Sequence, residues 1–210
     1  MKPRRPMDPY WMVLPTVLVL ATFFVVPLVN AVRYSLTRWD LLTAPEPAGL
    51  SNYQRIIESG QLGDLVWRTS TFGVIVVVGS TSLGLLLAVL LRHEGRVFGF
   101  VRGAVFSAYV VSWVAVALLW MWLLDGDVGL VARASKGLGL APVNWLGNPD
   151  VALYAIAFVT IWKITGYAMV IYLAGLTAIP PSLYEAASLD GASKLSQFRH
   201  ITWPSLWPTT

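Results

Sequence analysis

The stretch that decides the fold is TSTFGVIVVVGSTSLGLLLAVLL at residues 69–91, where 23 consecutive residues include no Lys, Arg, Asp or Glu. A helix rises about 1.5 Å per residue, so about 20 apolar residues cross the roughly 30 Å hydrocarbon core of a bilayer. Three more stretches of similar length, 11–32, 103–124 and 152–177, are uncharged apart from Lys163 in the last one. The sequence therefore predicts four complete transmembrane helices.

The composition of the whole chain excludes most soluble classes of protein. Of 210 residues, 56% are hydrophobic and 12% are charged, against about 25% charged residues in a soluble domain. The net charge of +4 is divided among short loops, so no nucleic-acid partner is expected. The chain has no Cys, which excludes disulfides and thiolate metal ligands. We predict an all-α polytopic membrane protein.

The second predicted span also carries a helix-packing signal. Ser80, Gly84 and Ala88 recur at every fourth position and so share one face of a helix. Small side chains on one face let the backbone of another helix approach closely. We expect a second helix to pack on this strip.

The distribution of basic residues predicts the orientation of the spans. Lys2, Arg4 and Arg5 precede the first apolar stretch, which at 22 residues is longer than a typical signal-peptide core. With four spans, the N-terminal side of the membrane holds eight Lys and Arg residues and the opposite side holds six. Because cytoplasmic loops carry the excess of basic residues, the N-terminus is predicted to be cytoplasmic.

The last ten residues, 201–210, form another uncharged stretch that contains Trp203. Ten residues are too few to cross a bilayer as a helix. We expect residues 204–210 to be the start of a fifth span, and the sequence to be cut at its entrance.

The segment between the fourth and fifth spans, residues 178–203, predicts two short cytoplasmic helices. Pro180 and Pro181 disfavour continuation of the fourth span as a helix. Ser182 followed by Glu185 fits a capping box, in which the two side chains satisfy free amides at a helix start. A short helix is therefore expected to begin at this point.

Two residues predict the end of that helix. Gly191 can adopt the left-handed conformation that ends a helix, and Asp190 can cap the helix that follows. We name residues 178–203 the elbow. Its ordered residues Glu185, Ala186, Ala187, Asp190, Gly191 and Ala192 resemble the EAA loop of ABC-importer permeases, closest to the maltose-transporter type of the carbohydrate and glycerol-phosphate branch.

Further matches to this branch extend the resemblance over most of the chain. They are Leu50-Ser51-Asn52-Tyr53, Trp122-Leu123-Leu124-Asp125 with Gly129, Trp162-Lys163 with Gly166, Leu173-Ala174-Gly175-Leu176, and Pro204 with Leu206 and Pro208. Trp203 is a departure, because the general motif has Leu at that position.

The resemblance implies a multi-pass permease subunit in the cytoplasmic membrane of a bacterium or archaeon. Its implied partners are a second permease subunit, a dimer of ATP-binding subunits, an extracytoplasmic solute-binding protein and membrane lipid. The chain has no G-x-x-x-x-G-K-[ST] loop, so it is not expected to be an enzyme or to bind a cofactor. ATP is expected to act through the partner ATPase, which moves the elbow as a lever.

Lys163 lies near the centre of the fourth span, where a charge is costly. It could line the translocation path and donate hydrogen bonds to a sugar or a phosphate, or it could brace the helix bundle through an ion pair or a carbonyl contact. Trp162, Tyr167 and Tyr172 could give aromatic platforms for a sugar, or they could pack against lipid and core. The sequence leaves both alternatives open.

Other candidate sites are weaker. Asp125-Gly126-Asp127 resembles the opening of a calcium loop, but Lys136 occupies the twelfth position, so a turn is expected. His93 and His200 lack nearby partners in sequence, and no metal site is predicted. The alternative function from another class is a membrane scaffold or regulatory subunit that binds a partner without transport.

Overall fold

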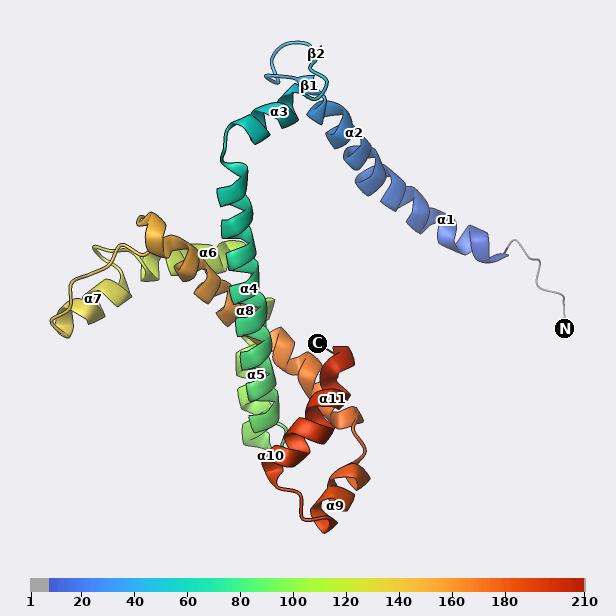
Figure 1. Ribbon diagram of the computed structural model, residues 1–210, viewed down its shortest axis with the longest axis vertical. Coiled ribbons are helices and arrows are strands. Elements are labelled where there is room, and N and C mark those ends of the chain that lie inside the picture. The colour runs from blue at the N-terminus through green and yellow to red at the C-terminus, as the bar shows by residue number, and fades with distance from the viewer. Residues whose placement is uncertain (1–7, 210) are drawn as a thin grey trace. The chain divides into compact units, whose positions relative to one another are not determined.

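The structure of the chain is a computed structural model that describes residues 8–209 (Figure 1). Its contacts group into two compact units, Met1–Val66 and Trp67–Thr210. The basic residues Lys2, Arg4 and Arg5, on which the predicted orientation partly depends, lie outside the described residues.

The first unit begins with a long apolar helical run. Its parts are α1 (Asp8–Leu20), a π-helical segment (Ala21–Val25) and α2 (Val26–Ser35). Residues Tyr10–Ser35 are long and apolar enough to cross a membrane, and none of this stretch is buried inside the structure. The run includes the predicted span 11–32.

A small hairpin and a short helix follow α2. They are β1 (Thr37–Arg38), β2 (Glu46–Pro47) and α3 (Ser51–Glu58). The two strands pair antiparallel, with Thr37 opposite Pro47 and Arg38 opposite Glu46. The fold is mostly helical, in agreement with the predicted class, and this brief pairing of two-residue strands is its only strand structure among the described residues.

The Asn52-Tyr53 pair ties α3 to the end of α2. The Asn52 side-chain amide donates to the carbonyl oxygens of Ser35 and Thr37, each at 2.9 Å. The Tyr53 hydroxyl donates to Ser35 Oγ at 2.6 Å. The contact with Ser35 satisfies a carbonyl that the end of α2 leaves free, and the contact with Thr37 ties α3 to β1.

The second unit is built on two long helices, α4 (Leu62–Leu90), whose first turn precedes the unit boundary, and α8 (Pro149–Ala178). Helix α8 contains the predicted span 152–177, and α4 contains the predicted span 69–91 except for its last residue. The small-residue strip on α4 is buried, and a Cβ on Gly84 would lie 2.6 Å from the Cβ of Ala168 on α8. The predicted close packing of a second helix is confirmed. The buried core here comprises Leu85, Ala88, Met169, Tyr172 and Leu206.

The predicted third span, 103–124, is not one continuous helix. Residues Arg96–Val110 form α5 and residues Trp113–Leu123 form α6, and the two helices meet at 96°. Val111 and Ser112 are extended, with ψ of 141° and 138° respectively. Both half-helices are apolar, so the absence of charge could not reveal the break. Among the described residues, three helices are long and apolar enough to span a membrane, or four if α5 and α6 together form one span.

The rest of the second unit comprises shorter helices. They are α7 (Leu130–Gly137), α9 (Pro181–Leu189), α10 (Lys194–Gln197), a π-helical segment (Phe198–Thr202), α11 (Trp203–Leu206) and a 3₁₀ turn (Trp207–Thr209). From Lys194 onward the helical segments follow one another directly. The predicted boundary between the elbow and a fifth span therefore falls inside a helical run, and residue 210 lies outside the described residues.

Candidate functional site

The first helix of the elbow begins without a capping box. Ile179 and Pro180 are extended, with ψ of 122° and 130°, and α9 starts at Pro181. No side chain caps this start, so the prediction that Ser182 and Glu185 form a capping box is wrong. Proline at the first helical position is already set at the helical φ and needs no donor there, which explains the earlier start.

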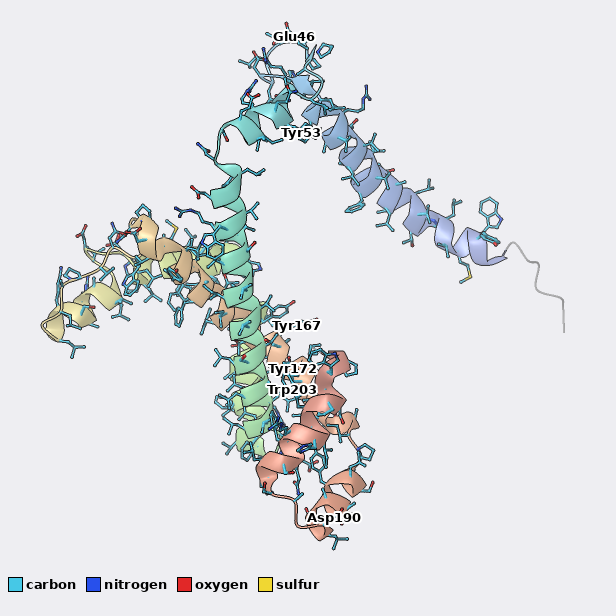
Figure 2. All side chains as sticks on the ribbon, in the orientation of Figure 1. Glu46, Tyr53, Tyr167, Tyr172, Asp190 and Trp203 are labelled. Atoms are coloured by element: carbon cyan, nitrogen blue, oxygen red, sulfur yellow. The ribbon has the colours of Figure 1, made fainter. Side chains whose placement is uncertain are left out.

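The turn after α9 is a Schellman motif. Gly191 has φ of +76°, and its N–H donates to the Ser188 carbonyl. The N–H of Ala192 donates to the Ala187 carbonyl at 2.9 Å, which completes the pattern. The predicted left-handed glycine is confirmed, and Figure 2 shows Asp190 at this turn.

The cap of the next helix was predicted at the wrong residue. Asp190 ends α9, and Ser193 caps α10 by accepting a hydrogen bond from Ser196 N at 3.2 Å. The Schellman turn places three residues, Asp190 to Ala192, between α9 and Ser193, which moves the cap beyond Asp190.

Side chains that the sequence analysis did not single out hold the elbow together. Gln197 Nε2 donates to Ser188 Oγ at 2.9 Å, across the turn. The hydroxyls of Tyr184 and Thr202 lie 2.9 Å apart and share a hydrogen bond, and Thr202 is buried. These partners are 9 and 18 residues apart in sequence, so no local pattern could have revealed them.

The elbow presents charge and apolar surface outward. Glu185, Ala186 and Asp190 are exposed, and Ala187 and Ala192 are half-buried. Leu189 is 90% exposed. Glu185 also lines a cavity of about 780 Å³ together with Arg92 and Lys194. This surface suits docking of another protein.

Lys163 is 1% exposed, at the centre of α8. Its ammonium donates to the carbonyl oxygens of Ala108 and Tyr109, each at 3.1 Å, and of Val111 at 2.5 Å. The same nitrogen lies 4.8 Å from the centre of the Trp113 ring, a cation–π distance. Of the two alternatives, the contacts match the carbonyl contact that braces the bundle.

The aromatic candidates on α8 face different neighbours. Trp162 is exposed and makes an edge-to-face contact with Trp120, with ring centres 5.5 Å apart. Tyr167 is exposed and stacks on Tyr109 at 4.9 Å. Tyr172, which Figure 2 labels on the same helix, is buried in the core, so for Tyr172 the core-packing alternative holds.

Asp125 forms the turn that was predicted instead of a calcium loop. The backbone N–H groups of Val128 and Asp127 donate to its carboxylate at 2.9 Å each and lower the pKa of Asp125.

A second carboxylate with a lowered pKa lies in the first unit. The pKa of Asp40 is lowered mainly by the backbone N–H of Thr43. Within residues 8–209 no group of three or more His, Asp or Glu side chains is placed to hold a metal ion.

Comparison with known proteins places these features in a family. Residues 80–210 match the family model described as binding-protein-dependent transport system inner membrane component. This match includes the small-residue strip, the α5–α6 break, Lys163 and the whole elbow.

Individual relatives agree with the family match. The trehalose/maltose transport system permease protein MalF of Thermococcus litoralis is 36% identical over 95% of this chain and 68% of its own length. The xylose/arabinose import permease protein XacH of Haloferax volcanii is 39% identical over 63% of this chain and 43% of its own.

Two solved structures also match. One is a bacterial ABC transporter involved in import of the acidic polysaccharide alginate, with 25% identity, a TM-score of 0.80, and coverage of 95% of this chain and 68% of that chain. The other is a bacterial alginate ABC transporter in complex with an alginate pentasaccharide-bound periplasmic protein, with 26% identity, a TM-score of 0.79, and coverage of 95% and 67%.

Proposed function

Because the chain belongs to the family of binding-protein-dependent transport system inner membrane components, we propose that it forms part of the translocation path for a sugar or a glycerol-phosphate compound. The chain is a permease subunit of a binding-protein-dependent ABC importer. Relatives named for trehalose/maltose and xylose/arabinose support a sugar as substrate. The alternative is a membrane scaffold or regulatory subunit that binds a partner without transport.

The proposed partners follow from the same family. An extracytoplasmic solute-binding protein delivers the substrate, as supported by the alginate transporter in complex with its periplasmic protein. A second permease subunit completes the path, and an ATPase dimer docks from the cytoplasm. We expect that dimer, and not this chain, to bind ATP. The location is the cytoplasmic membrane of a bacterium or archaeon.

The elbow is the proposed docking element for the ATPase. The observation that carries this proposal is the pairing of a tightly held turn at Gly191 with an outward-facing Leu189, 90% exposed. A rigid element transmits displacement, and an exposed apolar side chain gains free energy by entering a groove. Glu185 adds a charge to the same surface. Movement of the ATPase would then displace α9 and, through Ile179 and Pro180, the end of α8.

For the translocation path, Trp162 and Tyr167 are the proposed wall residues, because both rings are exposed and aromatic faces suit sugar rings. Lys163 lies between them in sequence, but its ammonium is already engaged by three carbonyls. A contact between this nitrogen and the substrate would require those hydrogen bonds to be exchanged. We therefore place Lys163 beside the path rather than on its surface.

The proposed topology has four crossings, with the N-terminus and the elbow in the cytoplasm and α5 with α6 as one broken span. Single cysteines test it directly, because the chain has none of its own. A cysteine at Leu42 should react with a membrane-impermeant maleimide from outside the cell, and one at Leu189 should react only from the cytoplasmic side. If α5 and α6 form a re-entrant loop instead, the number of crossings falls by one, and Leu42 and Leu189 are labelled from the same side of the membrane.

The transport function itself is tested in proteoliposomes that contain the chain with its second permease subunit, ATPase dimer and solute-binding protein. Uptake of labelled maltose, trehalose, xylose and glycerol 3-phosphate is measured with and without ATP. We expect ATP-dependent uptake of at least one of them that also requires the binding protein. ATP hydrolysis with no uptake of any sugar or glycerol phosphate would support the scaffold alternative.

A further inference from the structure

The break between α5 and α6 leaves carbonyl groups that need partners. The last carbonyls of a helix have no N–H group further along the same helix to bond with. In a bilayer there is no water to replace those partners, so each free carbonyl is costly. Ala108 and Tyr109 lie in the last turn of α5, and Val111 lies in the extended link.

We propose that Lys163 is a positioning residue whose ammonium ends α5 and fixes the α5–α6 break in place. An ammonium has three N–H donors, and these three carbonyls take them. A positive charge is also favoured at a helix C-terminus, where the helix dipole is negative. The chain thus supplies its own tethered cation at a broken helix end, a position where some transporters bind a free ion.

The α6 side of the break is held by the same side chain. Trp113 is the first residue of α6, and its ring covers the Lys163 nitrogen at 4.8 Å. One ammonium therefore contacts the end of α5, the link and the start of α6. Loss of the charge should release the angle between the two helices.

The next turn of α8 adds a close backbone contact to this joint. A Cβ on Gly166 would lie 2.5 Å from the Val105 carbonyl oxygen, so only glycine fits there. Tyr167 stacks on Tyr109, whose carbonyl accepts from Lys163. We name the contacts of Lys163, Gly166 and Tyr167 with α5 the α5–α8 joint. The proposed function adds one consequence: when the elbow moves α8, the joint carries the end of α5 with it.

The test measures the α5–α6 geometry directly. Val97 on α5 and Met121 on α6 are exposed and lie near the outer ends of the two helices, so the distance between them depends on the bend. Cysteines at both positions are spin-labelled in the assembled transporter, whose other subunits are cysteine-free. The distance distribution is then measured by double electron–electron resonance, with Lys163, Lys163→Met and Lys163→Arg.

We expect one narrow distance with Lys163, a broader or shifted distribution with Lys163→Met, and recovery of a narrow distribution with Lys163→Arg, which retains cationic donors. Lys136→Met is the matched control, because Lys136 is exposed on α7, and it should leave the distance unchanged. An unchanged distribution in Lys163→Met overturns the proposal.

If Lys163→Met does not assemble, Lys163→Arg and Trp113→Leu decide the question. A narrow distance in the first and a broadened one in the second support the proposal; an unchanged distance in Trp113→Leu, or a broad one in Lys163→Arg, overturns it. The distance measurement needs no transport activity. The proposed transport function can therefore fail while the role of Lys163 stands, and the role of Lys163 can fail while the transport function stands.

Discussion

The elbow and the α5–α8 joint both contain residues of the family resemblance. In the elbow most of these residues are exposed at the surface, whereas in the joint the central one, Lys163, is buried. In the elbow, Glu185 and Leu189 face outward, and the internal contacts are made by the backbone around Gly191 and by side chains outside the motif. In the joint, Lys163 is buried and all its contacts are internal. The difference teaches that one set of motif residues serves docking and the other serves the position of helices within the chain.

The largest expected effect comes from the joint. Gly166→Leu places a branched side chain against the backbone of α5, where even a Cβ would lie 2.9 Å from Phe106 Cα. Overpacking costs about 1–3 kcal/mol, and we expect the upper end of this range because the neighbour at Gly166 is backbone. We expect loss of assembled transporter, measured by the yield and melting temperature of the solubilised complex.

Gly103→Leu is the matched control for this variant. Gly103 lies on α5 itself, and a Cβ there has nothing within 4 Å. It should assemble like the unchanged protein. If Gly166→Leu assembles equally well, the close α5–α8 contact is not present in the assembled transporter. The α5–α8 joint could then not be contrasted with the elbow as a buried contact that positions helices.

The next effect comes from the elbow. Glu185→Lys and Gly191→Asp should leave membrane insertion intact and uncouple the ATPase, since the first reverses an exposed charge and the second disfavours the left-handed turn with φ of +76°. A loss of about 1.4 kcal/mol in docking corresponds to a tenfold lower affinity for the ATPase, and we expect substrate-stimulated ATP hydrolysis to fall as well. The measurement is ATPase activity with and without the loaded binding protein.

Gly191→Asn serves as the control for backbone conformation, because asparagine tolerates the left-handed region better than most residues. It should retain more coupling than a β-branched replacement, Gly191→Val. If substrate-stimulated ATP hydrolysis is unchanged in both Glu185→Lys and Gly191→Asp, the elbow does not couple the ATPase to transport.

A smaller effect is expected at Leu189. Leu189→Ala removes an exposed apolar side chain, so the stability of the chain should not change, while docking weakens by about 1–2 kcal/mol if this residue is central to the interface. Co-purification of the ATPase at increasing dilution measures the change. Leu42→Ala, in the hairpin of the first unit and similarly exposed, should have no effect on that co-purification.

The sequence predicted the features that depend on composition and local pattern. The charge-free stretches located the long helices, and the small-residue strip with Gly84 predicted the close approach of a second helix, which the structure identifies as α8. It could not predict the α5–α6 break, because both half-helices are apolar and the partner that stabilises the break, Lys163, comes more than 50 residues later. The role of Lys163 could not be predicted either, because its carbonyl partners are equally distant from it in sequence.

Within the elbow the same limit holds at a shorter range. The left-handed Gly191 was predictable, since few other residues adopt that conformation easily. The cap was assigned to Asp190 instead of Ser193 because both residue types cap helices equally well, and only the Schellman turn decides between them. The pairing of Tyr184 with Thr202 has no local signal, as the two residues are on different helical segments.

The smallest expected effect tests that pairing and separates rigidity of the elbow from its docking surface. Tyr184→Phe removes the hydroxyl that lies 2.9 Å from Thr202 Oγ1 and leaves the buried Thr202 hydroxyl without this partner, at a cost of about 1 kcal/mol. We expect a small fall in melting temperature and a modest loss of coupling, with ATPase co-purification unchanged. Ser182→Ala is the control, since α9 starts without a side-chain cap and the change should leave both stability and coupling intact. A loss of ATPase binding in Tyr184→Phe would mean that the internal contacts of the elbow also shape its outer surface, and the separation between outward and inward residues would then hold only for the α5–α8 joint.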